Sequence, residues 1–125
     1  MSVPLVPFSD PDAGMGETVV ASAPVSISPP QDHPYVSIIL PCYNEQGHVT
    51  DEVARICAAM DVSEYSYELI AFDDASTDAT LARLYEAAAQ FPRLEIVPFR
   101  RNGGSGTIRR IGTQRARGEI VVNRR

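Results

Sequence analysis

The chain has 125 residues, a formal net charge of -5, 44% hydrophobic residues and 22% charged residues. These fractions suit a folded globular protein and exclude a collagen-like chain, a disulfide scaffold and a wholly disordered chain. No apolar run approaches the roughly 18 residues needed to cross a bilayer, so we expect no membrane span. The two cysteines lack CxxC spacing, which favours a reducing, cytoplasmic location.

Charge is distributed unevenly along the chain. Residues 1–32 hold four acidic residues and no basic one, and residues 33–92 hold ten acidic residues and two arginines. Residues 93–125 reverse this balance, with nine arginines and two acidic residues. A basic third in an acidic protein indicates a local anion site rather than a nucleic-acid surface. All 11 basic residues are arginines, which excludes a Schiff-base lysine and a lysine-dependent phosphate loop.

The first 34 residues differ in composition from the rest. They contain seven of the ten prolines, show no helical periodicity and lack the basic start and apolar core of a signal peptide. We expect residues 1–34 to form a disordered, Pro-rich acidic tail. Residues 35–125 then form the folded domain.

The first predicted elements of this domain are a strand and a helix. Residues 36–40 form a short β-branched run that ends at Pro41, which is typical of a buried strand. From Val49 the apolar residues recur on one helical face, at Val53, Ile56, Cys57 and Met60.

The next pair repeats the alternation. Residues 69–72 predict a second buried strand, and Asp78 can cap the helix that follows. The apolar face of this helix comprises Leu81, Leu84, Tyr85 and Ala88.

The last predicted elements are strand, helix and strand. Residues 94–99 predict a third strand, which Pro98 places at a sheet edge because it weakens pairing. A helix over residues 105–117 ends at Gly118, and a fourth strand begins at Ile120.

This alternation predicts an α/β fold, with an open, mostly parallel sheet and crossover helices. Ligands of such sheets bind beyond the carboxyl ends of the strands. Three loops should therefore carry the function, at residues 41–45, 73–78 and 100–106.

Two adjacent acids follow the second strand. Asp73 and Asp74 come directly after Phe72, and adjacent side chains of a strand point to opposite faces. One carboxylate could accept hydrogen bonds from a nucleotide base or ribose while the other braces a loop. The alternative is that both cap the turn into the next helix.

The glycine-rich loop has the composition of a phosphate cradle. A dinucleotide fingerprint starting at Gly104 would need glycine where Arg109 stands, and a Walker A loop would need lysine. What remains is a helix N-terminus opened by Asn102 to Gly106, with Arg109 and Arg110 in its first turns, which suits a diphosphate. The alternative is a flexible loop followed by a solvated basic helix.

The loop after the first strand adds polar and aromatic groups. Tyr43 can stack, Asn44 can form hydrogen bonds and Glu45 can accept hydroxyl protons. The two histidines and two cysteines form no recognised zinc spacing, so no role is assigned to them.

Together the three loops resemble family 2 glycosyltransferases. The similarity lies in the segments VSIILPCYNEQGHV, ELIAFDDASTDAT and RNGGSGTIRRIGTQRARGEIVV, in this order and at these separations. It is closest to the branch of dolichol-phosphate mannose synthases and related polyprenyl-phosphate sugar transferases. The resemblance implies a GT-A fold that binds a nucleotide-diphosphate sugar, Mg²⁺ or Mn²⁺, and an acceptor such as a polyprenyl phosphate or glycan.

The resemblance also implies residue roles. Pro41, Tyr43 and Glu45 would line the nucleoside pocket, Asp74 would bond the base and Asp73 would support the same loop. The residues that would border the nucleotide and its phosphates are Asn102, Gly106 and Arg109.

The sequence departs from the family pattern after the fourth strand. The family places an Asp-x-Asp metal motif there, whereas Val122 is followed by Asn123-Arg124-Arg125. We therefore assign no catalytic residue or metal ligand, and expect an N-terminal portion of a glycosyltransferase that is inactive alone. A complete form could act at the inner face of the membrane. The alternatives are a non-catalytic nucleotide-binding module and an interaction fragment that pairs through its open sheet edge.

Overall fold

The computed structural model describes residues 33–124. Most of the tail expected at residues 1–34 lies outside this range. Pro34, at its end, is buried against the domain. The backbone N–H groups of Tyr35 and Val36 then donate hydrogen bonds to the Ser66 carbonyl at the start of the first strand.

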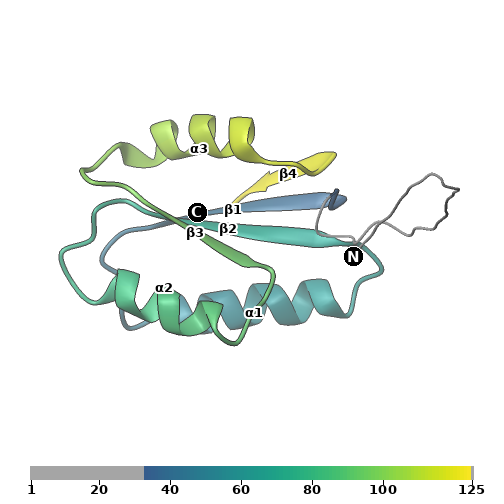
Figure 1. The fold of residues 1–125 in the computed structure, drawn as a ribbon, viewed down its shortest axis with the longest axis horizontal. Coiled ribbons are helices and arrows are strands. Elements are labelled where there is room, and N and C mark those ends of the chain that lie inside the picture. The colour runs from purple at the N-terminus through teal and green to yellow at the C-terminus, as the bar shows by residue number, and fades with distance from the viewer. Residues whose placement is uncertain (1–32, 125) are drawn as a thin grey trace, which may run out of the picture.

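Strands and helices alternate along the whole described part of the chain (Figure 1). Their bounds are β1 Val36–Cys42, α1 Val49–Asp61, β2 Tyr67–Asp73, α2 Thr80–Ala88, β3 Leu94–Pro98, α3 Gly104–Arg115 and β4 Ile120–Asn123. All four strands pair in parallel, in the order β3-β2-β1-β4. The predicted parallel α/β sheet is confirmed, as is the edge position of the Pro98 strand.

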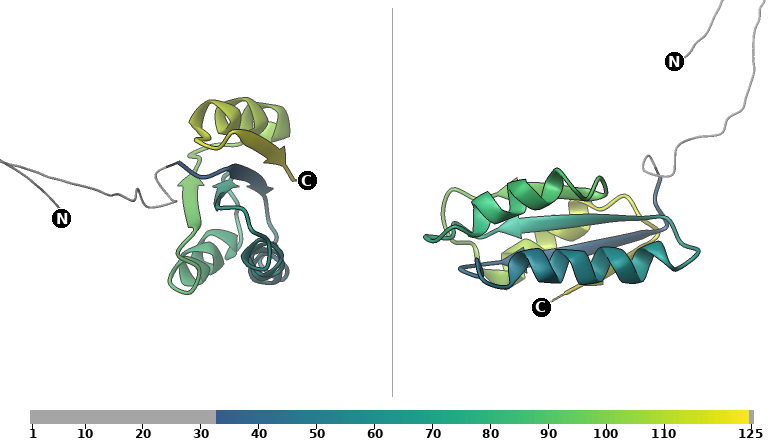
Figure 2. Two further views of the ribbon diagram at one scale, coloured as in Figure 1. Left: turned by 90° about the vertical axis from the view of Figure 1, so that its right-hand side faces the viewer. Right: turned by 90° about the horizontal axis from the view of Figure 1, so that it is seen from below.

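The helices cover both faces of the sheet (Figure 2). α1 and α2 pack on one face, over a core that includes Leu40, Leu69 and Leu84. α3 packs on the other face, where Ile39, Phe72 and Ile108 are buried together. β1 and β2 lie between these two cores and are buried almost throughout, which explains their continuous apolar runs.

The predicted end of α3 is wrong. The helix ends at Arg115, with Ala116 at the C-cap position, and Gly118 lies beyond it. A Cβ atom on Gly118 would come within 2.7 Å of the backbone nitrogen of Ser37. Glycine is therefore required here by the close approach of the α3–β4 connection to β1, and not by a helix terminus.

A buried polar network fastens this connection to the sheet. Glu68 of β2, 4% exposed, accepts hydrogen bonds from the Ser37 hydroxyl at 2.6 Å and from the Arg117 backbone N–H at 2.8 Å. Its other oxygen pairs with the Arg117 guanidinium, at 2.8 and 3.0 Å. The Gly118 N–H donates to Ser37 Oγ at 2.8 Å. Burial acts to raise the pKa of Glu68, but the bonds from Ser37 and Arg117 outweigh it and hold the pKa below its ordinary value.

This network predicts the effect of Glu68→Gln. A lost hydrogen bond to a charged group should lower the free energy of unfolding by about 2 kcal/mol at neutral pH. Because the pKa of Glu68 is lower in the folded chain, this stabilisation is present at neutral pH and disappears as the pH falls through that pKa. Urea unfolding from pH 7 down to pH 3 measures both effects.

Glu64→Gln is the matched control, since Glu64 is exposed in the loop before β2. It should leave the free energy of unfolding within about 0.5 kcal/mol of the wild type. Equal losses in the two variants would show that the network contributes nothing specific.

Candidate functional site

A pocket of about 450 Å³ opens where β1 and β2 end and α3 begins. Among the predicted site residues, Pro41, Tyr43, Glu45, Asp74 and Arg109 line it. The structure therefore places these five residues, from the first two loops and from α3, on one pocket. Asp73, Asn102 and Gly106 are not among the lining residues.

Asp74 joins all three loops. It is buried, and its two carboxylate oxygens accept the backbone N–H groups of Gly103 at 2.6 Å and Gly104 at 3.1 Å. Its own N–H donates to the Cys42 carbonyl at 2.8 Å, and its carbonyl accepts the side-chain amide of Asn102. A carboxylate at this position also interacts favourably with the positive end of α3.

Asp73 points to the other face of the sheet, as predicted from strand geometry. It is 2% exposed, and its Oδ2 accepts the Ser76 N–H at 3.2 Å, within its own loop. Its Oδ1 is buried and has no hydrogen-bond partner among the described residues. In this structure Asp73 therefore braces the β2–α2 loop and does not face the pocket.

The glycine-rich loop differs from the predicted phosphate cradle. The first four N–H groups of a helix have no intrahelical acceptor, and here they belong to Gly103, Gly104, Ser105 and Gly106. The Asp74 carboxylate accepts hydrogen bonds from the first two of these N–H groups. Gly106 lies on the outer groove of α3, so the pocket side of this helix is formed by Ser105, Ile108 and Arg109.

The loops after β1 and β2 are bonded to each other. Asn44 accepts the Thr77 N–H at 2.8 Å and donates its own N–H to Ser76 Oγ at 2.9 Å. The Glu45 N–H donates to Thr80 Oγ1 at 2.7 Å. The side chains of Asn44, Ser76 and Thr80 therefore hold the loop after β1 against the loop after β2.

Asp78 also belongs to this contact. It lies one residue before the N-cap position of α2, which Ala79 occupies, so the predicted cap is displaced by one residue. It nevertheless accepts the Thr80 N–H at 2.9 Å, and bonds from Thr80 lower the pKa of Asp78.

Two titratable groups of the pocket have raised pKa values. Burial, with Glu45 and Asp73 nearby, raises the pKa of the Cys42 thiol to about 12. The thiol therefore stays protonated at neutral pH and is no nucleophile. Partial desolvation and the neighbouring Glu52 raise the pKa of Glu45.

Four lining residues were not predicted from the sequence: Cys42, Ser105, Ile108 and Arg124. Ser105 lies four residues before Arg109 and three residues before Ile108 on α3. Helical periodicity therefore contained the signal for a shared face of the helix. Arg124 follows β4, and its guanidinium pairs with Glu52 of α1. No local pattern indicated that pairing.

The described residues do not fit a metal ion. Within residues 33–124, no three His, Cys, Asp or Glu side chains are grouped so that they could hold one. No step is therefore assigned to a metal bound by these residues. No helix in the same range has both the length and the apolarity to span a bilayer.

Comparison with known proteins places the chain in a family. The family model described as "Glycosyl transferase family 2" matches residues 37–123. The chain belongs to glycosyltransferase family 2. Both the predicted family and the predicted GT-A type of fold are confirmed.

Relatives of this family 2 chain include proteins named for sugar transfer. A dodecaprenyl-phosphate galacturonate synthase of Rhizobium johnstonii is 39% identical over 89 residues, which are 70% of this chain and 26% of the relative. A mannosyltransferase of Pyrobaculum calidifontis, solved with GDP-Man and Mn²⁺, has a TM-score of 0.61 and 27% identity, over 78% of this chain and 29% of that one. S. aureus TarS in complex with UDP-GlcNAc has a TM-score of 0.60 and 27% identity, over 71% and 25%. The match thus spans between 25% and 29% of the length of these compared chains, of which the TarS structure comprises residues 1–349 of that protein.

The loop after β2 also contains a strained residue. Ala75 has a φ of 59°, in the left-handed region, as does Asn44 with a φ of 50°. Asparagine tolerates this region, whereas alanine does so at a cost of about 1–2 kcal/mol because its Cβ approaches the following carbonyl.

Ala75→Gly should therefore raise the free energy of unfolding by about 0.5–1 kcal/mol, after the larger entropy of an unfolded glycine is subtracted. The matched control is Ala58→Gly, at an exposed position within α1. That change should lower stability by about 1 kcal/mol. Chemical denaturation measures both, and the same sign for the two variants would contradict the assignment of strain to Ala75.

Proposed function

We propose that the pocket binds the nucleoside diphosphate of a nucleotide sugar, and that the complete protein transfers the sugar to an acceptor. The observation that supports this most is that Tyr43, Asp74 and Arg109, from two loops and from helix α3, line one pocket. Its volume of about 450 Å³ lies in the range of small-molecule sites.

Different lining residues of the pocket suit different parts of the ligand. Tyr43, 46% exposed, offers a ring face to the nucleoside, and Asp74 is proposed to contact the base in addition to its bonds to α3. Arg109 and Ser105, which α3 contributes to the lining, are proposed to meet the diphosphate. Asn102 and Gly106 contribute indirectly, Asn102 through Asp74 and Gly106 through the shape of the helix start.

In the proposed reaction the acceptor oxygen attacks C1 of the sugar and the nucleoside diphosphate leaves with inversion. The residues of this chain bind and orient the donor, and none is assigned proton transfer. A guanidinium beside the leaving diphosphate stabilises the charge that develops on it. The Mg²⁺ or Mn²⁺ expected for the complete enzyme is part of this proposal and is assigned to none of residues 33–124.

The acceptor is proposed to be a polyprenyl phosphate. The name of the Rhizobium relative supports this choice, since it specifies a polyprenyl-phosphate product. We also propose a cytoplasmic location, at the inner membrane face for the complete protein. Cys42 and Cys57 are both buried free thiols, which is compatible with a reducing compartment.

Arg109→Ala tests the diphosphate contact. We expect UDP and GDP to lose affinity by about tenfold to hundredfold, because a charge-assisted hydrogen bond is removed. The affinities for uridine and guanosine should not change. Calorimetric titration of the four ligands against the full chain measures this.

Arg110→Ala provides the control for that experiment. It removes the same charge from the next residue, which lines the outer groove of α3 and not the pocket. Diphosphate affinity should stay within about threefold of the wild type, as expected for screened long-range charge. Equal losses in the two variants would refute a direct contact by Arg109.

Asp74→Asn tests the base contact. An amide keeps one acceptor oxygen but turns an NH2 group toward the N–H of either Gly103 or Gly104, so one of the two hydrogen bonds is lost and stability should fall by about 2 kcal/mol. If Asp74 also contacts the base, the ratio of UDP to GDP affinity should change as well. A uniform loss for both nucleotides would reduce Asp74 to a positioning residue of α3.

A further inference from the structure

Arginines without ion-pair partners gather around the start of α3. The structure pairs the guanidinium groups of other arginines with carboxylates, but none of Arg100, Arg101, Arg109 and Arg110 has an ion-pair partner within residues 33–124. All four are exposed. Charges that neither pair nor become buried add little to stability, so their concentration here needs another explanation.

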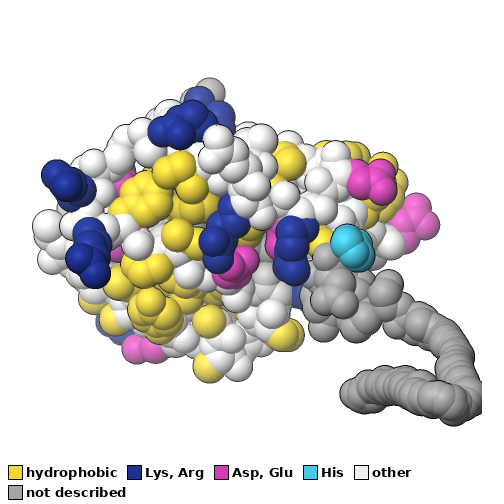
Figure 3. All heavy atoms as spheres, turned by 45° about the horizontal axis from the view of Figure 1, so that its top comes forward, with side chains coloured by type: hydrophobic (Ala, Val, Ile, Leu, Met, Phe, Trp, Pro, Cys, Tyr) yellow, Lys and Arg dark blue, Asp and Glu magenta, His cyan; other side chains and the backbone are white. Residues whose placement is uncertain are grey.

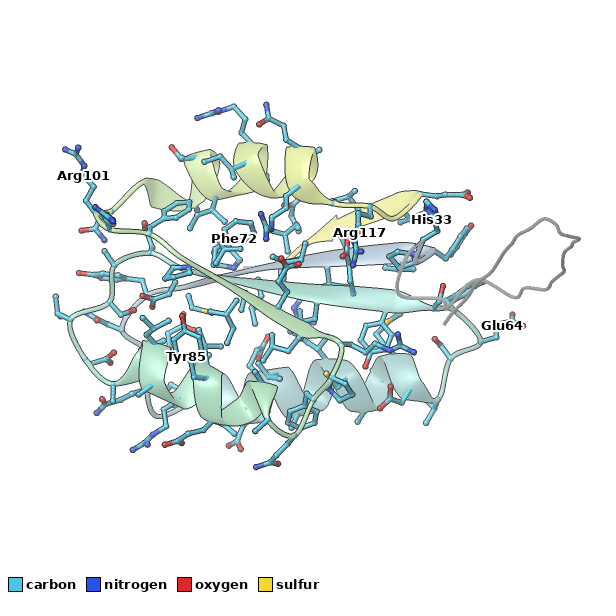
Figure 4. The ribbon with its side chains drawn as sticks, in the orientation of Figure 1. His33, Glu64, Phe72, Tyr85, Arg101 and Arg117 are labelled. Carbon is cyan, nitrogen blue, oxygen red and sulfur yellow. The ribbon has the colours of Figure 1, made fainter. Side chains whose placement is uncertain are left out.

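Two of these side chains, those of Arg101 and Arg110, can be placed on the outer side of the α3 layer. Figure 4 shows Arg101 projecting from the loop before α3, away from the body of the domain. Arg110 lies opposite the buried Ile108 on the helix, which places it on the side away from the sheet. It lines a shallow outer groove of about 490 Å³ together with Gly106, Arg109, Thr113 and Gln114. We name Arg100, Arg101 and Arg110 the basic patch.

The opposite layer is acidic. α1 carries Asp51, Glu52 and Asp61, and the arginines of α1 and α2 there are paired, Arg55 with Glu52 and Arg83 with Glu86. Figure 3, which brings the α3 side forward, shows arginine side chains spread over that face. The α3 side therefore carries the arginines that have no ion-pair partner within residues 33–124, among a smaller number of acidic side chains, while the helices of the other layer have a net negative charge. An extended anionic plane can approach these arginines from the α3 side.

We propose that the basic patch docks the domain on an anionic phospholipid bilayer. Single-stranded nucleic acid fits this surface less well, because it requires exposed aromatic rings for base stacking. The exposed aromatics of the described residues are Tyr35, Tyr43, Tyr65 and Tyr85, none of which belongs to β3, α3 or the loop between them.

The choice of a lipid surface rests on the proposed function. An enzyme whose acceptor is a polyprenyl phosphate must work at a membrane. Arg109 lines both the pocket and the outer groove, so a bilayer against this groove would lie directly beside the pocket. Docking through the basic patch would thus bring the donor to the membrane surface.

The test is co-sedimentation of the full chain with vesicles. Wild type should bind phosphatidylcholine vesicles that contain 30% phosphatidylglycerol, fail to bind pure phosphatidylcholine, and be released by 0.5 M NaCl. Each arginine near an anionic surface contributes about a factor of five to partitioning. The triple variant R100Q/R101Q/R110Q should therefore bind about a hundredfold more weakly.

The matched control is R55Q/R83Q/R93Q, which lowers the net charge equally but leaves the basic patch intact. Its partitioning should stay within about threefold of the wild type. The proposal is overturned if the two triple variants lose vesicle binding equally, or if the wild type does not bind the anionic vesicles. It is also overturned if the wild type binds a DNA duplex, at equal phosphate concentration, more tightly than the vesicles.

A nucleotide titration separates this proposal from the proposed function. R100Q/R101Q/R110Q should retain the UDP and GDP affinities of the wild type while losing the vesicles. Failure of every variant and of wild type to bind nucleotide would refute the proposed function, whereas the vesicle result would still decide the role of the patch.

Discussion

The buried carboxylate of Asp74 is the constraint on which the pocket depends. It receives the first N–H groups of α3, while the backbone of the same residue is bonded to the end of β1 and to the Asn102 side chain. Burying a carboxylate without hydrogen-bond partners costs free energy, and here that cost is offset by these hydrogen bonds and by the helix dipole. Asp74 therefore holds the start of α3 at the sheet ends, and the core around Ile108 holds the rest of the helix, so that Arg109 lies on the pocket wall.

The same arrangement separates two electrostatic tasks. A free helix N-terminus would attract a phosphate by itself, but here the negative charge of Asp74 already occupies it. Positive charge toward a diphosphate must then come from side chains one turn further along, where Arg109 stands. The arginines that do not face the pocket make the outer side of the α3 layer positively charged. One short helix thus presents an occupied terminus, a cationic pocket wall and a cationic outer face.

The sequence predicted the order and type of all seven elements, because buried parallel strands and amphipathic helices have distinct periodicities. Sheet geometry indicated only that the loops beyond the carboxyl ends of the strands carry the function. The resemblance to family 2 glycosyltransferases implied a nucleotide pocket bordered by Pro41, Tyr43, Glu45, Asp74 and Arg109, and these five residues line one pocket. The sequence could not predict which loop groups bond to each other. Whether the Gly103 and Gly104 amides meet a ligand or Asp74 depends on contacts across 29 and 30 residues. The role of Gly118 was missed for the same reason, because its neighbour is Ser37.

The seating of α3 and β4 on β1 has a consequence for how the chain folds. Two glycines make this seating close: Gly112 lies against Ile39, and Gly118 bonds to Ser37 from 81 residues away in sequence. β1, α1 and β2 follow one another in the chain as a parallel β-α-β unit, so their contacts close shorter stretches of chain and form at a smaller entropic cost. The α3–β4 unit should therefore dock last, onto a sheet that already exists. The basic wall of the pocket would then be completed only in the final step of folding, and during synthesis only after nearly all of the described chain has been made.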